Sequence, residues 1–207
     1  MSIASTETST WPSTSQRLTL VPRPNTPSDS AYSQAADALG IEIKLIKAFA
    51  KVEGGEWGAF LPDGRPIILF ERHWFHRLTS GKYDNYGIPG VLSNSKPGGY
   101  GKISAQYSKL EQASKLDKEA AHKSCSWGLF QIMGFNHLRA GYPDVFSFVD
   151  AINLSVDNHL RSFVSFIKSD PKLYQALKDK NWLLLGLLYN GDGNTYGSKI
   201  KFEYERG

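Results

Sequence analysis

The chain has 207 residues, 41% of them hydrophobic, and its 24 basic and 20 acidic side chains give a formal net charge of +4. This length and apolar content predict one folded domain, or one domain plus a tail. The single cysteine, Cys125, excludes an intramolecular disulfide, and the lack of about twenty consecutive apolar residues excludes a membrane-spanning helix. The basic residues do not cluster, so we expect no nucleic-acid partner.

The N-terminal stretch differs in composition from the rest of the chain. Residues 1–27 are dominated by Ser, Thr and Pro, which is typical of a disordered tail or linker. We therefore expect a disordered tail over 1–27 and a folded domain over 28–207. The first residues carry neither the basic cluster nor the apolar stretch of a secretory signal, so we expect no signal peptide.

Helical patterns begin directly after this tail. Asp29 or Ser30 can cap a first helix that runs to about Leu39, where Gly40 ends it. Residues 41–52 then carry apolar side chains at helical spacing, and the two glycines that soon follow end this second helix.

The next two segments predict a hairpin and a loop. Residues 59–70 place two short apolar runs on either side of the turn-forming sequence Pro62–Arg65, which predicts a β-hairpin. The glycine-rich stretch Gly81–Gly101 predicts a long ordered loop or a mobile flap.

From Ser104 almost to the C-terminus the pattern is helical. Apolar residues in 145–168 recur at steps of one, three or four, which predicts one continuous helix against the core. Asp170 and Pro171 supply the N-cap and first-turn proline of another helix. Residues 182–189 are apolar nearly all round, which predicts a central helix. The predicted fold class is mainly α (α+β), with a small β-hairpin near its start.

Glu53 is the most informative single position. It shares a helix face with Ile46 and Phe49, so its carboxyl group points towards the core or a cleft. Burial and the negative end of its own helix both favour the neutral acid. A carboxylic acid that stays protonated near neutral pH suits a general acid that protonates a glycosidic oxygen. The alternative is a structural glutamate paired with a lysine at the helix end.

Other motifs accompany Glu53 in a fixed order. Ser126–Gly134 reads SWGLFQIMG, and Tyr189–Gly191 reads YNG. A glutamate at a helix end, followed by S-x-G-x-x-Q-I and then Y-N-G, resembles the lysozyme-like superfamily of peptidoglycan-cleaving enzymes. That superfamily includes the soluble lytic transglycosylases and the goose-type lysozymes.

A closer resemblance covers almost everything after the tail. Four segments look like the signature of the N-acetylmuramidase catalytic domain of phage endolysins: Ile68–Phe75, Gly98–Gly101, Ser126–Asn136 and Tyr189–Gly191. The resemblance implies a lysozyme-like helical domain with a hairpin bordering the cleft. It also implies that Glu53 is the catalytic acid and that peptidoglycan glycan strands are cut after N-acetylmuramic acid. Two positions depart from the pattern, because glycine follows Glu53 where serine is usual and His159 replaces a frequent glutamine.

Several residues of these motifs are predicted to bind the substrate. Gln131 and Asn190 offer donors and acceptors to acetamido and hydroxyl groups, and Trp127 and Tyr189 can stack on sugar rings. Ser126 lies in the same motif and completes the predicted set. The alternative is that Trp127 and Tyr189 are core aromatics and that Asn190 belongs only to a helix cap.

A second carboxylate is needed to activate water or to stabilise the transition state. Glu71, after an apolar strand, and Asp63, in the hairpin turn, are the candidates. We favour Glu71, because Asp63 is well explained as a turn residue. Glu71 could instead orient the site through an ion pair with Arg72 or His73. If neither carboxylate acts as a base, the substrate's own acetamido or hydroxyl group replaces water, as in a transglycosylase.

Two further groups of residues have patterns that only partly match known sites. His73 and His76 lie near Glu71, but their spacing is not that of the zinc motif H-E-x-x-H, so we expect no metal and no cofactor. Cys125 and His122 resemble a thiol and imidazole pair, but a small buried thiol explains Cys125 better.

The sequence therefore predicts a monomeric muramidase that acts on peptidoglycan in bacterial lysis, without stable membrane insertion. The alternatives are a lytic transglycosylase with the same cleft and a peptidoglycan-binding module that does not cut. We expect a phage endolysin that accumulates in the host cytoplasm and acts on the periplasmic cell wall. A toxin delivered into a competitor bacterium fits the same features.

Overall fold

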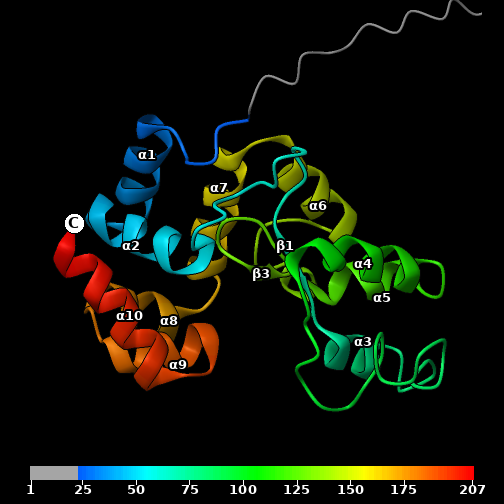
Figure 1. Ribbon diagram of the computed structural model, residues 1–207. Helices are drawn as coiled ribbons and strands as arrows, with labels where there is room; N and C mark the ends of the chain where they lie inside the picture. Colours follow the sequence, from blue (N-terminus) through cyan, green and yellow to red (C-terminus); the bar gives the residue numbers. More distant parts are fainter. Residues whose placement is uncertain (1–22) are drawn as a thin grey trace, which may run out of the picture.

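A computed structural model describes residues 23–207 and shows helices grouped around a small antiparallel sheet (Figure 1). The helices are α1 (Asp29–Leu39), α2 (Ile43–Gly54), α3 (Arg72–Leu78), α4 (Gln106–Ser114), α5 (Lys118–Lys123), α6 (Val145–Leu154), α7 (Val156–Lys168), α8 (Pro171–Lys178), α9 (Trp182–Asn190) and α10 (Gly193–Arg206). The strands are β1 (Ile68–Phe70), β2 (Cys125–Trp127) and β3 (Ile132–Met133). The mainly α class with a small β part is confirmed, and none of these helices is long and apolar enough to cross a membrane.

Helices α1 and α2 form as the sequence predicts. Ser28, one residue before the predicted cap, accepts a hydrogen bond from the Ala31 amide at 3.2 Å. Gly40 ends α1 in the left-handed conformation, with φ of 63°. The buried face of α2 includes Ile46 and Phe49, so the helix presents its end, and Glu53, beside the core.

The three strands form one antiparallel sheet in the order β1-β2-β3. Ile68 lies opposite Trp127 and Phe70 lies opposite Cys125, and all four of these side chains are buried. The sheet thus joins the two segments that carry Glu71 and the 126–134 motif, which lie far apart in the sequence. The prediction of helices alone after Ser104 missed β2 and β3, because these strands are too short to show a period of two.

The predicted β-hairpin over 59–70 is only partly present. One isolated bridge joins Phe60 to Pro66 around the expected turn, while Ile68–Phe70 pairs with β2 instead. The side chain of Asn25 accepts hydrogen bonds from the Ala59 and Phe60 amides at 3.1 and 2.7 Å. Because a side chain occupies these amides, the first segment does not extend into a strand.

The predicted continuous helix over 145–168 is two helices, α6 and α7. Ser155 between them is extended, with φ of −160° and ψ of 154°, and its side chain accepts a hydrogen bond from the Asn158 amide. Serine competes with helix formation by capping, so the apolar stripe stays continuous while the backbone breaks. The start of α8 at Pro171, capped by Asp170, is as predicted.

The prediction that 182–189 is a central helix is wrong. In α9 only Leu185 and Gly186 are buried, whereas Leu183 and Leu187 are 58% and 54% exposed. Helix α10 covers one side so closely that a Cβ atom at Gly186 would lie 2.7 Å from the Gly197 nitrogen. Apolar composition alone did not reveal that this helix is covered on one side only.

Only residues 23–27 of the predicted tail belong to the part of the chain that the structure describes. The first 22 residues lie outside it. Residues 23–27 contact the domain: Pro27 is buried, Asn25 holds the 59–60 amides, and Arg23 donates to the Asn153 carbonyl. The described domain therefore begins before Ser28.

Candidate active site

Glu53 lies in the last turn of α2 and is partly buried. The hydroxyl group of Tyr196, on α10, donates a hydrogen bond to its Oε1 atom. Burial raises the pKa of Glu53 to about 7, and the Tyr196 hydrogen bond opposes this shift only in part. The carboxyl group can therefore hold its proton near neutral pH, as the helical pattern indicated.

Two tyrosines form the wall behind Glu53. The rings of Tyr189 and Tyr196 stack with centroids 5.7 Å apart and planes at 11°, and Tyr189 meets Phe49 edge-on at 5.2 Å. Burial, and next the charge of Glu53, raises the pKa of both phenols well above its usual range. Both hydroxyl groups thus remain neutral donors.

The structure brings the three sequence motifs together at this wall. The Tyr189 hydroxyl donates to the Phe130 carbonyl at 2.9 Å. Gly54, next to Glu53, packs so closely on the 126–131 turn that a Cβ atom there would lie 2.6 Å from Leu129 Cδ1. The glycine that departs from the family pattern is therefore in tight contact, and serine there would need Leu129 to move.

His159, the other departure, supports the same turn from behind. It is 1% exposed, its Nδ1 atom accepts from the Leu129 amide at 3.0 Å, and its Nε2 atom lies 2.8 Å from the Ile152 carbonyl. Burial lowers its pKa to about 4. A neutral imidazole thus supplies one acceptor and one donor, which a glutamine amide can also supply.

The predicted substrate-binding residues differ in availability. Gln131 is partly exposed, accepts from the Ser126 hydroxyl at 2.7 Å and donates to the Gly128 carbonyl at 2.7 Å. Asn190 is exposed at the end of α9. Ser126 is 5% exposed and serves here as the partner of Gln131.

Trp127 does not fit its predicted stacking role. Its ring is 2% exposed, and its indole N–H donates to the His122 carbonyl at 3.0 Å. The core alternative therefore describes Trp127. Tyr189 is partly exposed, but its ring packs between Phe49 and Tyr196 and its hydroxyl group is engaged, so it supports the site from within.

Glu71 lies at the start of α3 in a second polar cluster. Its Oε2 atom is 3.1 Å from His73 Nδ1. Burial raises the pKa of Glu71, and the His73 imidazole and Tyr100 both oppose the shift. Of the two partners that the sequence offered, His73 contacts Glu71, whereas Arg72 donates to backbone carbonyls instead.

Asp63 and Cys125 have structural surroundings. The Asp63 carboxylate pairs with Arg65 at 2.6 Å in the exposed turn, which lowers its pKa. Cys125 is fully buried, and burial raises the pKa of its thiol well above the usual range. The imidazole of His122 lies 2.7 Å from the Lys118 carbonyl rather than contacting the thiol. Among residues 23–207, no three His, Cys, Asp or Glu side chains are grouped to hold a metal ion.

Sequence reasoning missed Tyr196, the hydrogen-bond donor to Glu53. Tyr196 lies far from Glu53 in the chain, and no periodic pattern connects the two residues.

The fold places one partly buried carboxyl group at a helix end and a second one in a polar cluster, and a glycoside hydrolase uses such a pair of carboxyl groups. A family model described as N-acetylmuramidase matches residues 42–207. The chain belongs to this family, and its substrate is peptidoglycan.

Comparison with solved structures agrees with this family assignment. The crystal structure of the Burkholderia AP3 phage endolysin matches with a TM-score of 0.78 and 39% sequence identity. The match covers 88% of this chain and 71% of the endolysin chain. A comparison with curated proteins gave no match.

Proposed function

We propose that the protein hydrolyses the β-1,4 bond after N-acetylmuramic acid, with Glu53 as the general acid. The observation that carries the proposal is the partly buried carboxyl group of Glu53 at the end of α2, held by the Tyr196 hydroxyl group, where burial raises its pKa to about 7. Such a group is protonated often enough at neutral pH to protonate a leaving sugar oxygen, and acidic enough to release the proton.

The Tyr196 contact supports different roles for the two oxygens of Glu53. Oε1 accepts a hydrogen bond from the Tyr196 hydroxyl group, so in this mechanism Oε2 carries the carboxyl proton. As the glycosidic bond breaks, Oε2 transfers this proton to the leaving oxygen, and the resulting carboxylate keeps the Tyr196 hydrogen bond. The stacked tyrosines fix the orientation of the carboxyl group during this transfer.

Glu71 supplies the second carboxylate in this mechanism. In its ionised form, next to the His73 imidazole, this carboxylate activates a water molecule or stabilises positive charge on the sugar. We also propose a role in bacterial lysis, because the similar solved structure is a phage endolysin.

The test is the clearing of a suspension of outer-membrane-permeabilised cells by wild type and Glu53→Gln. The matched control is Glu56→Gln, which changes an exposed glutamate three residues away. We expect clearing by wild type and Glu56→Gln and none by Glu53→Gln. Equal clearing by all three would remove Glu53 from the mechanism.

Mass spectrometry of the released fragments identifies the reaction. Reducing sugar ends indicate hydrolysis, whereas anhydro ends indicate a transglycosylase. A wild type that binds purified cell-wall sacculi but releases no fragments would be a binding module, which contradicts the proposal.

A further inference from the structure

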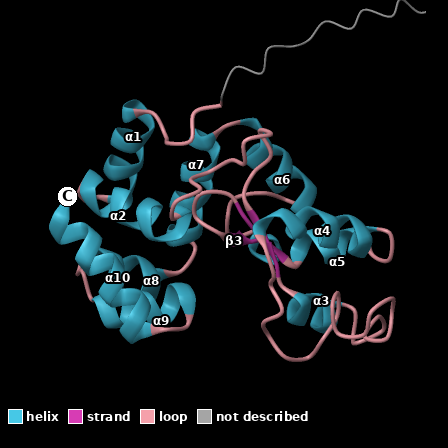
Figure 2. Cartoon of the chain, viewed as in Figure 1, coloured by secondary structure: helices cyan, strands magenta, loops and turns pink. Residues whose placement is uncertain are grey.

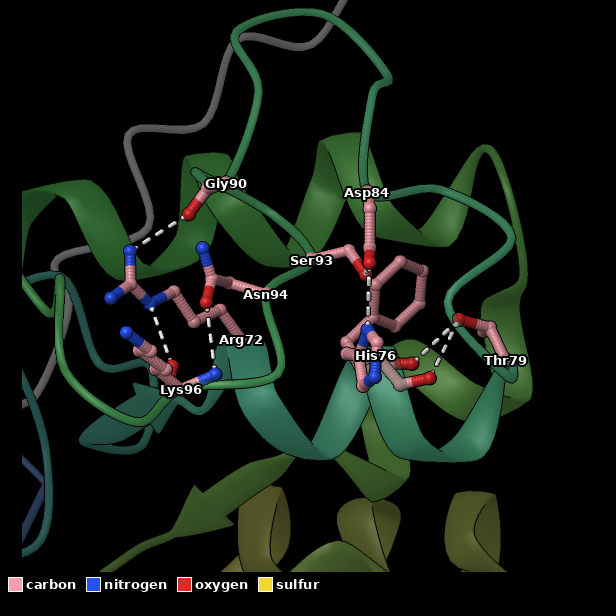
Figure 3. Close-up of polar contacts among 9 residues, drawn as sticks. Arg72, His76, Thr79, Asp84, Gly90, Ser93, Asn94 and Lys96 are labelled. Atoms are coloured by element: carbon pink, nitrogen blue, oxygen red, sulfur yellow. Dashed lines mark hydrogen bonds and ion pairs between the residues drawn. The ribbon is translucent and has the colours of Figure 1, made fainter.

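The segment between α3 and α4 includes the glycine-rich stretch 81–101, which contains no helix or strand and is nevertheless held to α3 (Figure 2, Figure 3). Asp84 pairs with His76 of α3 at 2.8 Å and accepts a hydrogen bond from the Ser93 hydroxyl group. These contacts join two points of the loop to one carboxylate. The stretch is therefore an ordered loop, as one of the two predicted alternatives had it.

Arg72, at the start of α3, holds the same loop at a second place. Its guanidinium group donates at 2.8, 3.2 and 3.2 Å to the carbonyls of Gly90, Lys96 and Pro97. Figure 3 shows the first two of these contacts. The Gly90 amide also donates to the Asp84 carbonyl at 3.2 Å, so Asp84 and Gly90 are fixed beside each other. They form the base of a short turn.

Residues 85–89, here called the tip, project from this base. Figure 3 shows the backbone between Asp84 and Gly90 as an arch that rises away from α3. Gly87, within the tip, has φ of +62°. Apart from its chain neighbours, no atom of residues 23–207 lies within 4 Å of the place that a Cβ atom on Gly87 would take. Because both ends of the tip are fixed, its side chains stay outside the core.

The tip presents apolar side chains to solvent. Ile88 is 74% exposed and Tyr86 is 50% exposed. Val91, directly after the base, and Leu78, at the end of α3, are exposed as well. Single exposed apolar residues are common on protein surfaces, whereas a group of them on one projecting segment is typical of a contact site.

The part of the chain that carries the tip is also the basic part. Residues 72–123, from α3 to α5, contain nine basic and four acidic side chains, a formal net charge of +5. The rest of the chain contains 15 basic and 16 acidic side chains, a net charge of −1. Four of the cations, on α3 and on the segment that follows it, are exposed: Arg77, Lys82, Lys96 and Lys102. The net positive charge of the protein therefore belongs to the part with the apolar tip.

Helix α9 exposes apolar side chains without such a charge. Its residues Leu183 and Leu187 are exposed, but residues 182–206, which form α9 and α10, contain three basic and three acidic side chains. The face of α9 thus has no charge that favours one apolar partner over another. The tip combines apolar contact with positive charge, which matches a surface of negative headgroups above an apolar interior.

We propose that the tip and the cations around its base dock the protein on an anionic lipid bilayer, with Tyr86 and Ile88 at the boundary between headgroups and acyl chains. The cations are attracted to the lipid phosphates, and the tip is stabilised by the removal of apolar side chains from water. Peptidoglycan also carries carboxylates, but it offers no apolar layer for Ile88. The inference goes beyond the proposed function and uses neither Glu53 nor Glu71.

The first test measures binding of the full chain to lipid vesicles by sedimentation. Vesicles of phosphatidylglycerol mixed with phosphatidylcholine are compared with vesicles of phosphatidylcholine alone. We expect wild type to bind only the mixed vesicles, and Ile88→Ser to bind them about 10-fold more weakly, since the apolar contact is lost. The matched control is Leu187→Ser, which changes a leucine that is 54% exposed on α9 and should bind as wild type does.

The second test removes positive charge at two different places. Lys82→Gln combined with Lys96→Gln should weaken binding to the mixed vesicles about 10-fold at low salt, because each cation near an anionic surface contributes to binding. The control combines Lys172→Gln with Lys178→Gln, which changes two exposed lysines of α8 and gives the same net charge. It should bind nearly as wild type does, and high salt should remove the difference between the two double variants.

Three results would overturn the proposal: a wild type that does not bind the mixed vesicles, equal binding by Ile88→Ser and Leu187→Ser, or equal binding by the two lysine double variants. All of these positions are exposed, so unchanged Tm values confirm that each variant folds. Weaker binding of Ile88→Ser to purified sacculi, without vesicle binding by wild type, would assign the tip to the substrate instead. The vesicles contain no peptidoglycan, so their results do not depend on whether Glu53 is the general acid.

Discussion

The two carboxyl groups of the site have similar surroundings and opposite expected charges. Glu53 and Glu71 are both partly buried, and burial raises the pKa of both. Glu53 accepts a hydrogen bond from Tyr196 and lies against the stacked rings of Tyr189 and Tyr196. Glu71 instead lies 3.1 Å from the His73 imidazole, which favours its ionised form.

This difference predicts a bell-shaped pH profile. Activity rises as Glu71 loses its proton and falls as Glu53 loses its own, with the alkaline limb near pH 7 because the pKa of Glu53 is about 7. The Tyr196 hydrogen bond lowers the pKa of Glu53. Removing the Tyr196 hydroxyl group therefore moves the alkaline limb to higher pH and leaves the acid limb in place.

The largest effect is expected for substitution of the proposed general acid, Glu53. Glu53→Gln should lower kcat by about 10³-fold, because general acid catalysis contributes about 10²–10⁴. Steady-state kinetics on soluble glycan strands measure this, with Glu56→Gln as the control. A loss below about 10-fold would mean that another group protonates the leaving oxygen.

Glu53→Gln should lower activity but raise the free energy of unfolding at neutral and alkaline pH. The folded-state pKa of Glu53 is raised from 4.5 to about 7, so its contribution is complete below pH 4.5 and is lost as the pH rises through 7. The glutamine cannot ionise, so Glu53→Gln should gain about 3 kcal/mol in unfolding free energy over wild type between pH 4 and pH 8. Urea unfolding at the two pH values checks this, and equal differences at both would show that Glu53 is not desolvated.

Glu71→Gln should have a smaller effect than Glu53→Gln. We expect a loss of about 10²-fold in kcat/KM, at the lower end for a group that activates water. The acid limb of the pH profile should disappear, because glutamine does not titrate. A retained acid limb with reduced activity would assign that limb to a group other than Glu71.

The smallest expected effect is a shift of the alkaline limb that should differ between Tyr196→Phe and Tyr189→Phe. Tyr196→Phe keeps the ring stack but removes the donor to Glu53, so the alkaline limb should move upward by about one pH unit. Tyr189→Phe removes a hydroxyl group that binds the Phe130 carbonyl, and the limb should stay in place. Equal shifts in both variants would mean that packing, and not the hydrogen bond, sets the pKa.

The sequence predicted the mainly α class from apolar residues at helical spacing. It predicted the role of Glu53 because a carboxylate on an apolar helix face is visible within one turn of helix. It did not predict the exposed side of α9, since apolar composition does not show how many neighbours cover a helix. It misplaced Trp127, because an aromatic residue in a motif can serve the core or the substrate equally well. The donor Tyr196 depends on a contact between distant segments, which no local pattern contains.

The central claim is that Glu53 is protonated near neutral pH, and its titration tests this most directly. Difference infrared spectra between wild type and Glu53→Gln, recorded from pH 4 to pH 9, isolate the carboxylic acid band of this residue. We predict that the band is present at pH 6 and disappears with a midpoint near pH 7. A midpoint near 4.5, the value of an exposed glutamate, would contradict the account.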